Sequence, residues 1–124
     1  MWLLSTLYSE VEPRPQWLEL AKHGIDFIER FGFDADGKMF FQVTRAGDPL
    51  RKRRYLFTEG FGVLAFAAYG KAACDQEYIR KAYDLYSFME KYPENPDRML
   101  PKVNSSVRPT KAAKASTPNP SVKR

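Results

Sequence analysis

The sequence Thr58-Glu59-Gly60-Phe61-Gly62-Val63-Leu64-Ala65-Phe66-Ala67-Ala68-Tyr69 decides the fold of this chain. Almost all of its side chains are small or apolar, so a helix formed here would be apolar on nearly every side. A helix of that kind is typically buried by its neighbours. Thr58 is a good N-cap residue, and we predict one buried helix from there to about Ala73.

Amphipathic segments flank this buried helix. Pro15 suits the first turn of a helix that we predict to reach Phe31. Asp75 is a suitable N-cap for another helix that ends near Tyr92. A further helix is predicted over residues 2–11, where the prolines that follow end it. A more buried helix thus alternates with an amphipathic one, which is typical of αα-hairpins stacked in a solenoid or closed into a toroid.

A β-hairpin is predicted to interrupt the helices at about residues 38–57. Residues 34–37 (Asp-Ala-Asp-Gly) form a turn, and residues 39–45 are rich in strand-forming side chains. A second turn at residues 46–49 leads into another extended run. The predicted fold class is therefore all-α with one inserted β-hairpin.

The positive charge of the chain is concentrated at its C-terminal end. The 124 residues carry 20 Lys and Arg against 15 Asp and Glu, a formal net charge of +5. Residues 1–97 contain every acidic residue and have a net charge of −2, whereas residues 98–124 have a charge of +7 and are rich in Pro, Ser and Lys. We predict a folded domain over residues 1–97 and a disordered basic tail over residues 98–124. Because the charge belongs to the tail, we expect no nucleic-acid partner.

Composition excludes several classes of site. Cys74 is the single cysteine and His23 the single histidine, which excludes an internal disulfide, a cysteine-built zinc site and a two-histidine centre within this chain. Phosphate-binding loops, dinucleotide fingerprints and metal-ligand spacings are missing from the sequence, so we predict no cofactor and no metal. The sequence has no apolar run near the ~20 residues of a membrane span and no signal-peptide pattern at its start. We therefore expect a cytoplasmic protein without a membrane partner.

Five motifs, in order along the chain, resemble a known family. They are residues 2–8 (WLLSTLY), 17–24 (WLELAKHG), 41–45 (FQVTR), 55–61 (YLFTEGF) and 65–69 (AFAAY). Together they resemble the N-acylglucosamine 2-epimerase family of sugar epimerases and isomerases, over roughly residues 1–111. The resemblance implies an (α/α)6 toroid with its active site in the central cavity, of which residues 1–97 would be a part. It also implies a sugar or amino-sugar substrate, proton transfer at C2 through an enediolate, no redox cofactor, and a homodimer as one candidate assembly.

Four residues are candidates for sugar binding by this resemblance. Glu59 begins the buried helix at the end that faces the cavity in the family, next to Phe61, and its carboxylate could bond sugar hydroxyls. The alternative for Glu59 is an acid that complements the helix dipole. Trp2 could stack on a sugar ring or pack in an apolar stripe, and Arg108 would lie at the cavity rim. His23 is predicted to be a solvated or packing residue rather than a catalytic one.

The catalytic set of the family is not matched in this chain. The family uses two histidines with a partner glutamate from later helices and an arginine upstream of the motif at Trp2, whereas this chain has one histidine. We therefore predict a fragment of such an enzyme, as a truncated or frame-shifted reading frame would produce, which is inactive alone. The alternative hypothesis is a non-catalytic helical-hairpin module that binds a protein partner.

Overall fold

The structure is a computed structural model that describes residues 1–52 and 56–91. Its elements in chain order are α1 (Trp2–Glu10), α2 (Pro15–Phe31), β1 (Gln42–Val43), β2 (Pro49–Arg51), α3 (Phe57–Ala73) and α4 (Gln76–Glu90). The predicted mostly helical fold is confirmed. The predicted tail, residues 98–124, lies outside the described residues.

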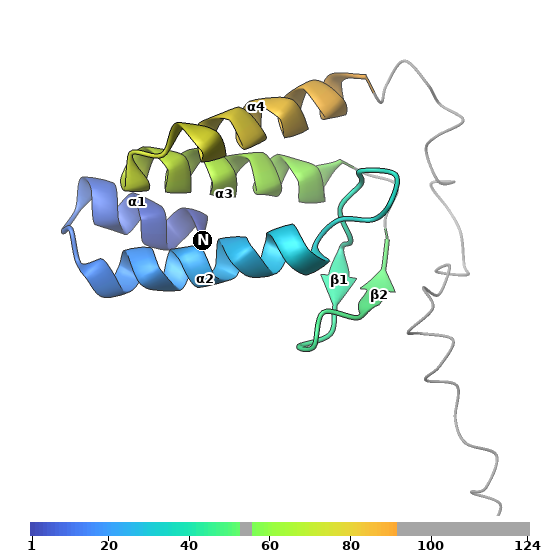
Figure 1. Ribbon diagram of the computed structural model, residues 1–124, viewed down its shortest axis with the longest axis horizontal. Helices are drawn as coiled ribbons and strands as arrows, with labels where there is room; N and C mark the ends of the chain where they lie inside the picture. Colours follow the sequence, from blue (N-terminus) through green and yellow to red (C-terminus); the bar gives the residue numbers. More distant parts are fainter. Residues whose placement is uncertain (53–55, 92–124) are drawn as a thin grey trace, which may run out of the picture.

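The helices run back and forth, and α3 packs against α1, α2 and α4 (Figure 1). α1 runs in the same direction as α3 and begins partway along it. The small sheet lies at the end of the molecule where α2 finishes and α3 starts. This arrangement makes α3 the central element of the described fold.

Local sequence signals set the starts of α2 and α4. α2 begins at Pro15, whose missing N–H costs nothing in the first turn. Asp75 caps α4, because its side chain accepts a hydrogen bond from the backbone N–H of Glu77 at 2.9 Å. The prediction that Thr58 caps α3 is wrong. α3 begins at Phe57, so the N-cap residue is Leu56. The backbone N–H of Gly60 donates a hydrogen bond of 3.0 Å to the carbonyl of Leu56, and this bond closes the first turn of the helix before Thr58 could cap it.

The inserted sheet is shorter than the hairpin predicted for residues 38–57. Gln42 pairs with Arg51 and Val43 with Pro49, and the register shifts between the two pairs. Proline has no N–H to donate, which limits the ladder at that point. The rest of the predicted hairpin is irregular backbone within the described residues.

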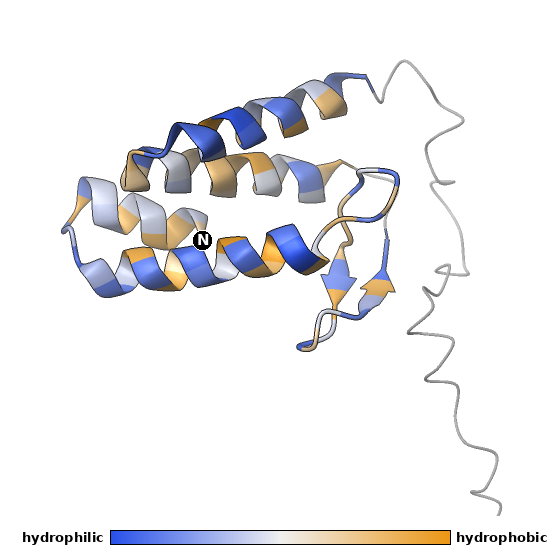
Figure 2. Cartoon of the chain, viewed as in Figure 1, coloured by the Kyte–Doolittle hydropathy of each residue, from blue (hydrophilic) through white to orange (hydrophobic). Residues whose placement is uncertain are grey.

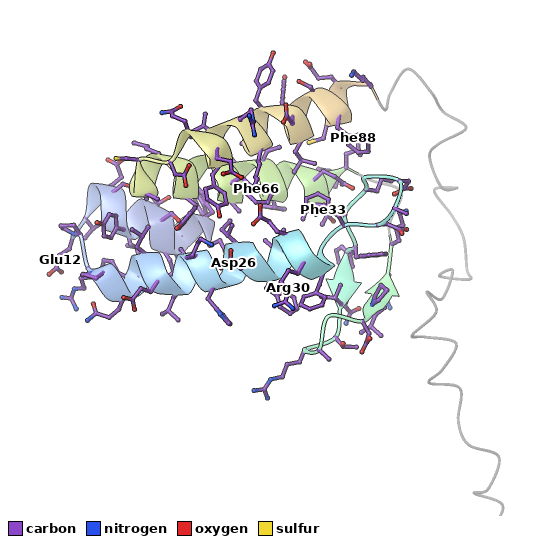
Figure 3. All side chains as sticks on the ribbon, viewed as in Figure 1. Glu12, Asp26, Arg30, Phe33, Phe66 and Phe88 are labelled. Atoms are coloured by element: carbon purple, nitrogen blue, oxygen red, sulfur yellow. The ribbon has the colours of Figure 1, made fainter. Side chains whose placement is uncertain are left out.

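The core lies between α2, α3 and α4. Phe66 on α3 is 2% exposed, and its ring lies 6.4 Å from those of Phe33 and Tyr78 (Figure 3). Tyr69 meets Tyr78 edge-on at 4.9 Å. The buried apolar residues are Ala21, Ile25, Met39, Ala65, Phe66, Tyr69, Tyr78, Ala82 and Leu85. A Cβ on Gly70 would lie 2.9 Å from the backbone nitrogen of Ile79, so glycine allows α3 and α4 to approach closely.

One side of α3 is open and apolar. Phe61 is 71% exposed and Leu64 is also exposed, while Trp2 and Leu3 on the adjoining α1 are more than half exposed. The prediction of a helix buried on all sides is therefore wrong for the described structure. Figure 2 shows the contrast with α4, which is largely hydrophilic. Large exposed apolar patches mark surfaces that meet a partner, a ligand or further polypeptide.

Candidate functional site

Glu59 ties the start of α3 to the segment that precedes the sheet. The side chain is 1% exposed, and its Oε1 accepts a hydrogen bond from the backbone N–H of Met39 at 2.8 Å. Oε2 is also buried and has no hydrogen-bond partner among the described residues. The carboxylate thus holds the loop with one oxygen, and its second oxygen is uncommitted.

Lys38 is buried beside this carboxylate, a placement that the sequence did not indicate. Burial lowers the pKa of Lys38, and the negative charge of Glu59 opposes that shift. The only local signal is a lysine placed directly before the apolar run Met39-Phe40-Phe41. Two buried groups of opposite charge therefore lie close enough to influence each other where the loop joins α3.

Lys52 closes the same loop from the other side. Its Nζ lies 2.7 Å from Oδ2 of Asp34 and 2.6 Å from Oδ2 of Asp36, and the lysine side chain is mostly buried. The turn that carries both acids is thereby joined to the end of β2. Glu59 and Lys52 together fix the path of the chain between α2 and α3.

The ion pairs of Lys52 with Asp34 and Asp36, called the Lys52 clamp from here on, predict that the protein loses stability in acid. The hydrogen bond from Lys52 holds the pKa of Asp34 below its ordinary value of 3.8. A carboxyl whose pKa is lowered by folding stabilises the protein above its unfolded pKa, and that contribution is lost as the pH falls through the folded pKa. We expect the free energy of unfolding to fall below about pH 4.

Urea unfolding between pH 2.5 and 6 measures this effect, with pH values chosen to span the ordinary aspartate range near 4. In Lys52→Met the free energy of unfolding should fall less steeply below about pH 4, because Asp34 loses the partner that lowers its pKa. Lys91→Met, at an exposed lysine after α4, is the matched control and should leave the pH dependence of the free energy of unfolding unchanged. An equal reduction of the acid-induced stability loss in both variants would contradict the role of the Lys52 clamp.

The structure separates the four predicted sugar-binding residues. Glu59 points inward and Phe61 outward, since two residues on a helix differ by about 200° in direction. Phe61 and Trp2 both belong to the open apolar side, being 71% and 53% exposed. Arg108 lies outside the described residues. Their role in sugar binding stays a prediction.

The single histidine lies apart from these residues. His23 is exposed on α2, which agrees with the predicted solvated residue. In the described ranges, no three His, Cys, Asp or Glu side chains gather as metal ligands would. Within the same ranges, every helix is too short or too polar to cross a membrane.

These features define a mostly helical protein with an open apolar side next to a clamped loop. The sequence profile of the N-acylglucosamine 2-epimerase (GlcNAc 2-epimerase) family matches residues 1–120, and the chain belongs to this family. The family resemblance predicted from the motifs is confirmed. The match extends past Lys111, where we expected the resemblance to end.

Two curated relatives are similar to part of this chain. Cellobiose 2-epimerase from Dictyoglomus turgidum (strain DSM 6724 / Z-1310) is 26% identical over 96 residues, which cover 77% of this chain and 24% of the relative. N-acylglucosamine 2-epimerase from Bos taurus is 30% identical over 89 residues, which cover 68% of this chain and 21% of the relative. The chain therefore spans about a fifth to a quarter of the length of these relatives.

Proposed function

We propose that this chain is one part of a sugar 2-epimerase or aldose–ketose isomerase, which transfers a proton at C2 of a ring-opened sugar through an enediolate. The observation that carries the proposal is the family match over residues 1–120, supported by two relatives named as 2-epimerases. Under this proposal α1–α4 form a segment of an (α/α)6 toroid. The remainder of the toroid supplies the acid and the base on the two faces of the sugar.

The open side of α3 supports a role in contacting the sugar. Phe61 and Trp2 present aromatic faces to the outside of the described structure, and such faces can pack on the apolar face of a sugar ring. Glu59 has almost no exposed surface, so its part in this proposal is to hold the loop at Met39. Arg108 lies outside the described residues, and its role in sugar binding stays a prediction.

A hydrogen-exchange experiment in D2O tests the proposal. The 124-residue chain alone should incorporate no deuterium at C2 of N-acetylmannosamine, mannose or cellobiose, because its one histidine cannot serve both faces of the sugar. A chimera in which residues 1–91 replace the matched segment of the Dictyoglomus cellobiose 2-epimerase should exchange C2 deuterium. The parent enzyme is the positive control. A folded chimera that exchanges nothing would remove the support for this function.

The same open side also favours a second candidate, a non-catalytic module that binds a protein partner. Exposed Leu3 and Leu64 extend the apolar surface beyond the two aromatic residues. Size-exclusion chromatography with the dye ANS separates the candidates. A monodisperse chain that binds ANS at its open apolar side supports the module, whereas aggregation supports a segment of a larger fold.

A further inference from the structure

The open side of α3 contains a row of side chains with the spacing that one helix offers to another. The row consists of Phe57, Gly60, Leu64, Ala67 and Lys71, at intervals of three, four, three and four residues. Positions with this period lie along one face of a helix, and a second helix packs lengthwise on such a face. Gly60 and Ala67 are small, so the axis of a neighbouring helix can approach closely. We call this row the α3 seam.

The centre of the α3 seam is uncovered in the part of the chain that the structure describes. Leu64 is 48% exposed, and Phe57 at the start of the seam is 73% exposed. The next two residues after Leu64 differ sharply, since Ala65 is 5% exposed and Phe66 is 2% exposed. α3 therefore buries one face against α1, α2 and α4 and leaves the seam open.

The α3 seam presents almost no charge. Residues 57–68 contain a single ionisable side chain, Glu59, which is 1% exposed and lies off the seam. Lys71 at the far end forms an ion pair with Glu10 of α1 at 2.6 Å, so its charge is already matched. A nucleic acid or a charged polypeptide would find no complementary charge here. The occupant that fits is an apolar face of a helix.

The two curated relatives indicate where such a helix comes from. The chain spans 24% of one relative and 21% of the other, so most of each relative lies outside the match. Large exposed apolar surfaces mark contacts with further polypeptide. We propose that the α3 seam binds an apolar helix from the remainder of a 2-epimerase fold, also when that remainder is a separate polypeptide. The inference rests on the proposed function and adds the contact through which the two parts assemble.

The α3 seam leaves room for the sugar contact proposed above. Phe61 lies three positions before Leu64, which places it about 60° further round the helix. Trp2 belongs to α1. A helix on the seam and a sugar at Phe61 therefore occupy neighbouring strips of the open side.

Co-expression with a tagged partner tests the proposal. The partner is the part of the Dictyoglomus cellobiose 2-epimerase that follows its matched segment, and the 124-residue chain should copurify with it. Leu64→Asp places a charge in the contact and should reduce the recovered chain by about tenfold or more. Leu64→Ala should reduce it by a smaller factor. Leu20→Asp makes the same change as Leu64→Asp at a 58% exposed position on α2, and recovery should stay unchanged.

Thermal unfolding provides the same test within one polypeptide. In the 124-residue chain, Leu64→Asp should shift the Tm by less than about 2 °C, because Leu64 is exposed there. In the chimera with the Dictyoglomus enzyme, the same substitution should lower the Tm by at least about 5 °C, because the seam is then covered. Leu20→Asp should have an equally small effect in both proteins. These measurements follow assembly, whereas C2 deuterium exchange follows the reaction, so the two proposals fail separately.

Three outcomes would overturn the proposal. The first is the absence of copurification with the unmodified chain, which includes a tagged partner that stays insoluble. The second is equal recovery of Leu64→Asp and the unmodified chain, or an equal loss for Leu64→Asp and Leu20→Asp. The third is a dimer of the 124-residue chain that Leu64→Asp dissociates, since a second copy would then be the occupant of the seam.

Discussion

Phe66→Ala is expected to lower the free energy of unfolding by about 3–5 kcal/mol. The Phe66 ring is 2% exposed and lies against Phe33 from the loop and Tyr78 from α4. Removing it deletes both ring contacts and leaves a cavity where α2, α3 and α4 meet. A loss of this size is a large part of the total stability of a small domain, and urea unfolding measures it directly.

Phe61→Ala on the same helix is the matched control. The chemical change is identical, but Phe61 is 71% exposed and contributes little to the core. We expect the free energy of unfolding to change by less than about 0.5 kcal/mol. If the two variants lose the same stability, the open side of α3 is covered in solution and its assignment as an exposed surface is contradicted.

The helices could be predicted from the sequence because their signals are local. Pro15 and Asp75 act within one turn of their own helices, and the structure has both helices starting where those residues predict. The start of α3 could not be predicted in the same way. Thr58 is a good cap in isolation, but the chain leaving the sheet already turns at Leu56.

The open side of α3 could not be predicted because it depends on neighbours rather than on periodicity. The segment from Gly60 to Tyr69 is apolar all round, so its pattern contains no information about which side is covered. Contacts with α1, α2 and α4 decide that question. The exposure of Phe61 follows from that packing.

The candidate site was predicted only in part for a similar reason. The motif that includes Glu59 and Phe61 indicated the family, and the family match confirms it. The partner of Glu59 is the backbone of Met39, twenty positions earlier in the chain. No local pattern predicts that contact or the burial of Lys38, since both arise when the loop folds back on α3.

Glu59→Ala is expected to lower the free energy of unfolding by about 3 kcal/mol, through two separate losses. The buried N–H of Met39 loses its acceptor, and an unpaired buried donor costs about 1–3 kcal/mol. Lys38 loses the negative charge that opposes its desolvation. Urea unfolding measures the sum, and amide hydrogen exchange at Met39 reports the first loss alone.

Glu59→Gln divides the effect into its parts. The glutamine oxygen can still accept from Met39, so protection of that amide should persist while stability falls by only about 1–2 kcal/mol. Normal exchange at Met39 in Glu59→Ala would contradict the anchoring role. The chimera then distinguishes positioning from sugar contact. If Glu59 only holds the loop, the chimera with Glu59→Gln should keep most of its epimerase activity. If the carboxylate instead binds a sugar hydroxyl, the same substitution removes a charged acceptor and should raise the KM of the chimera.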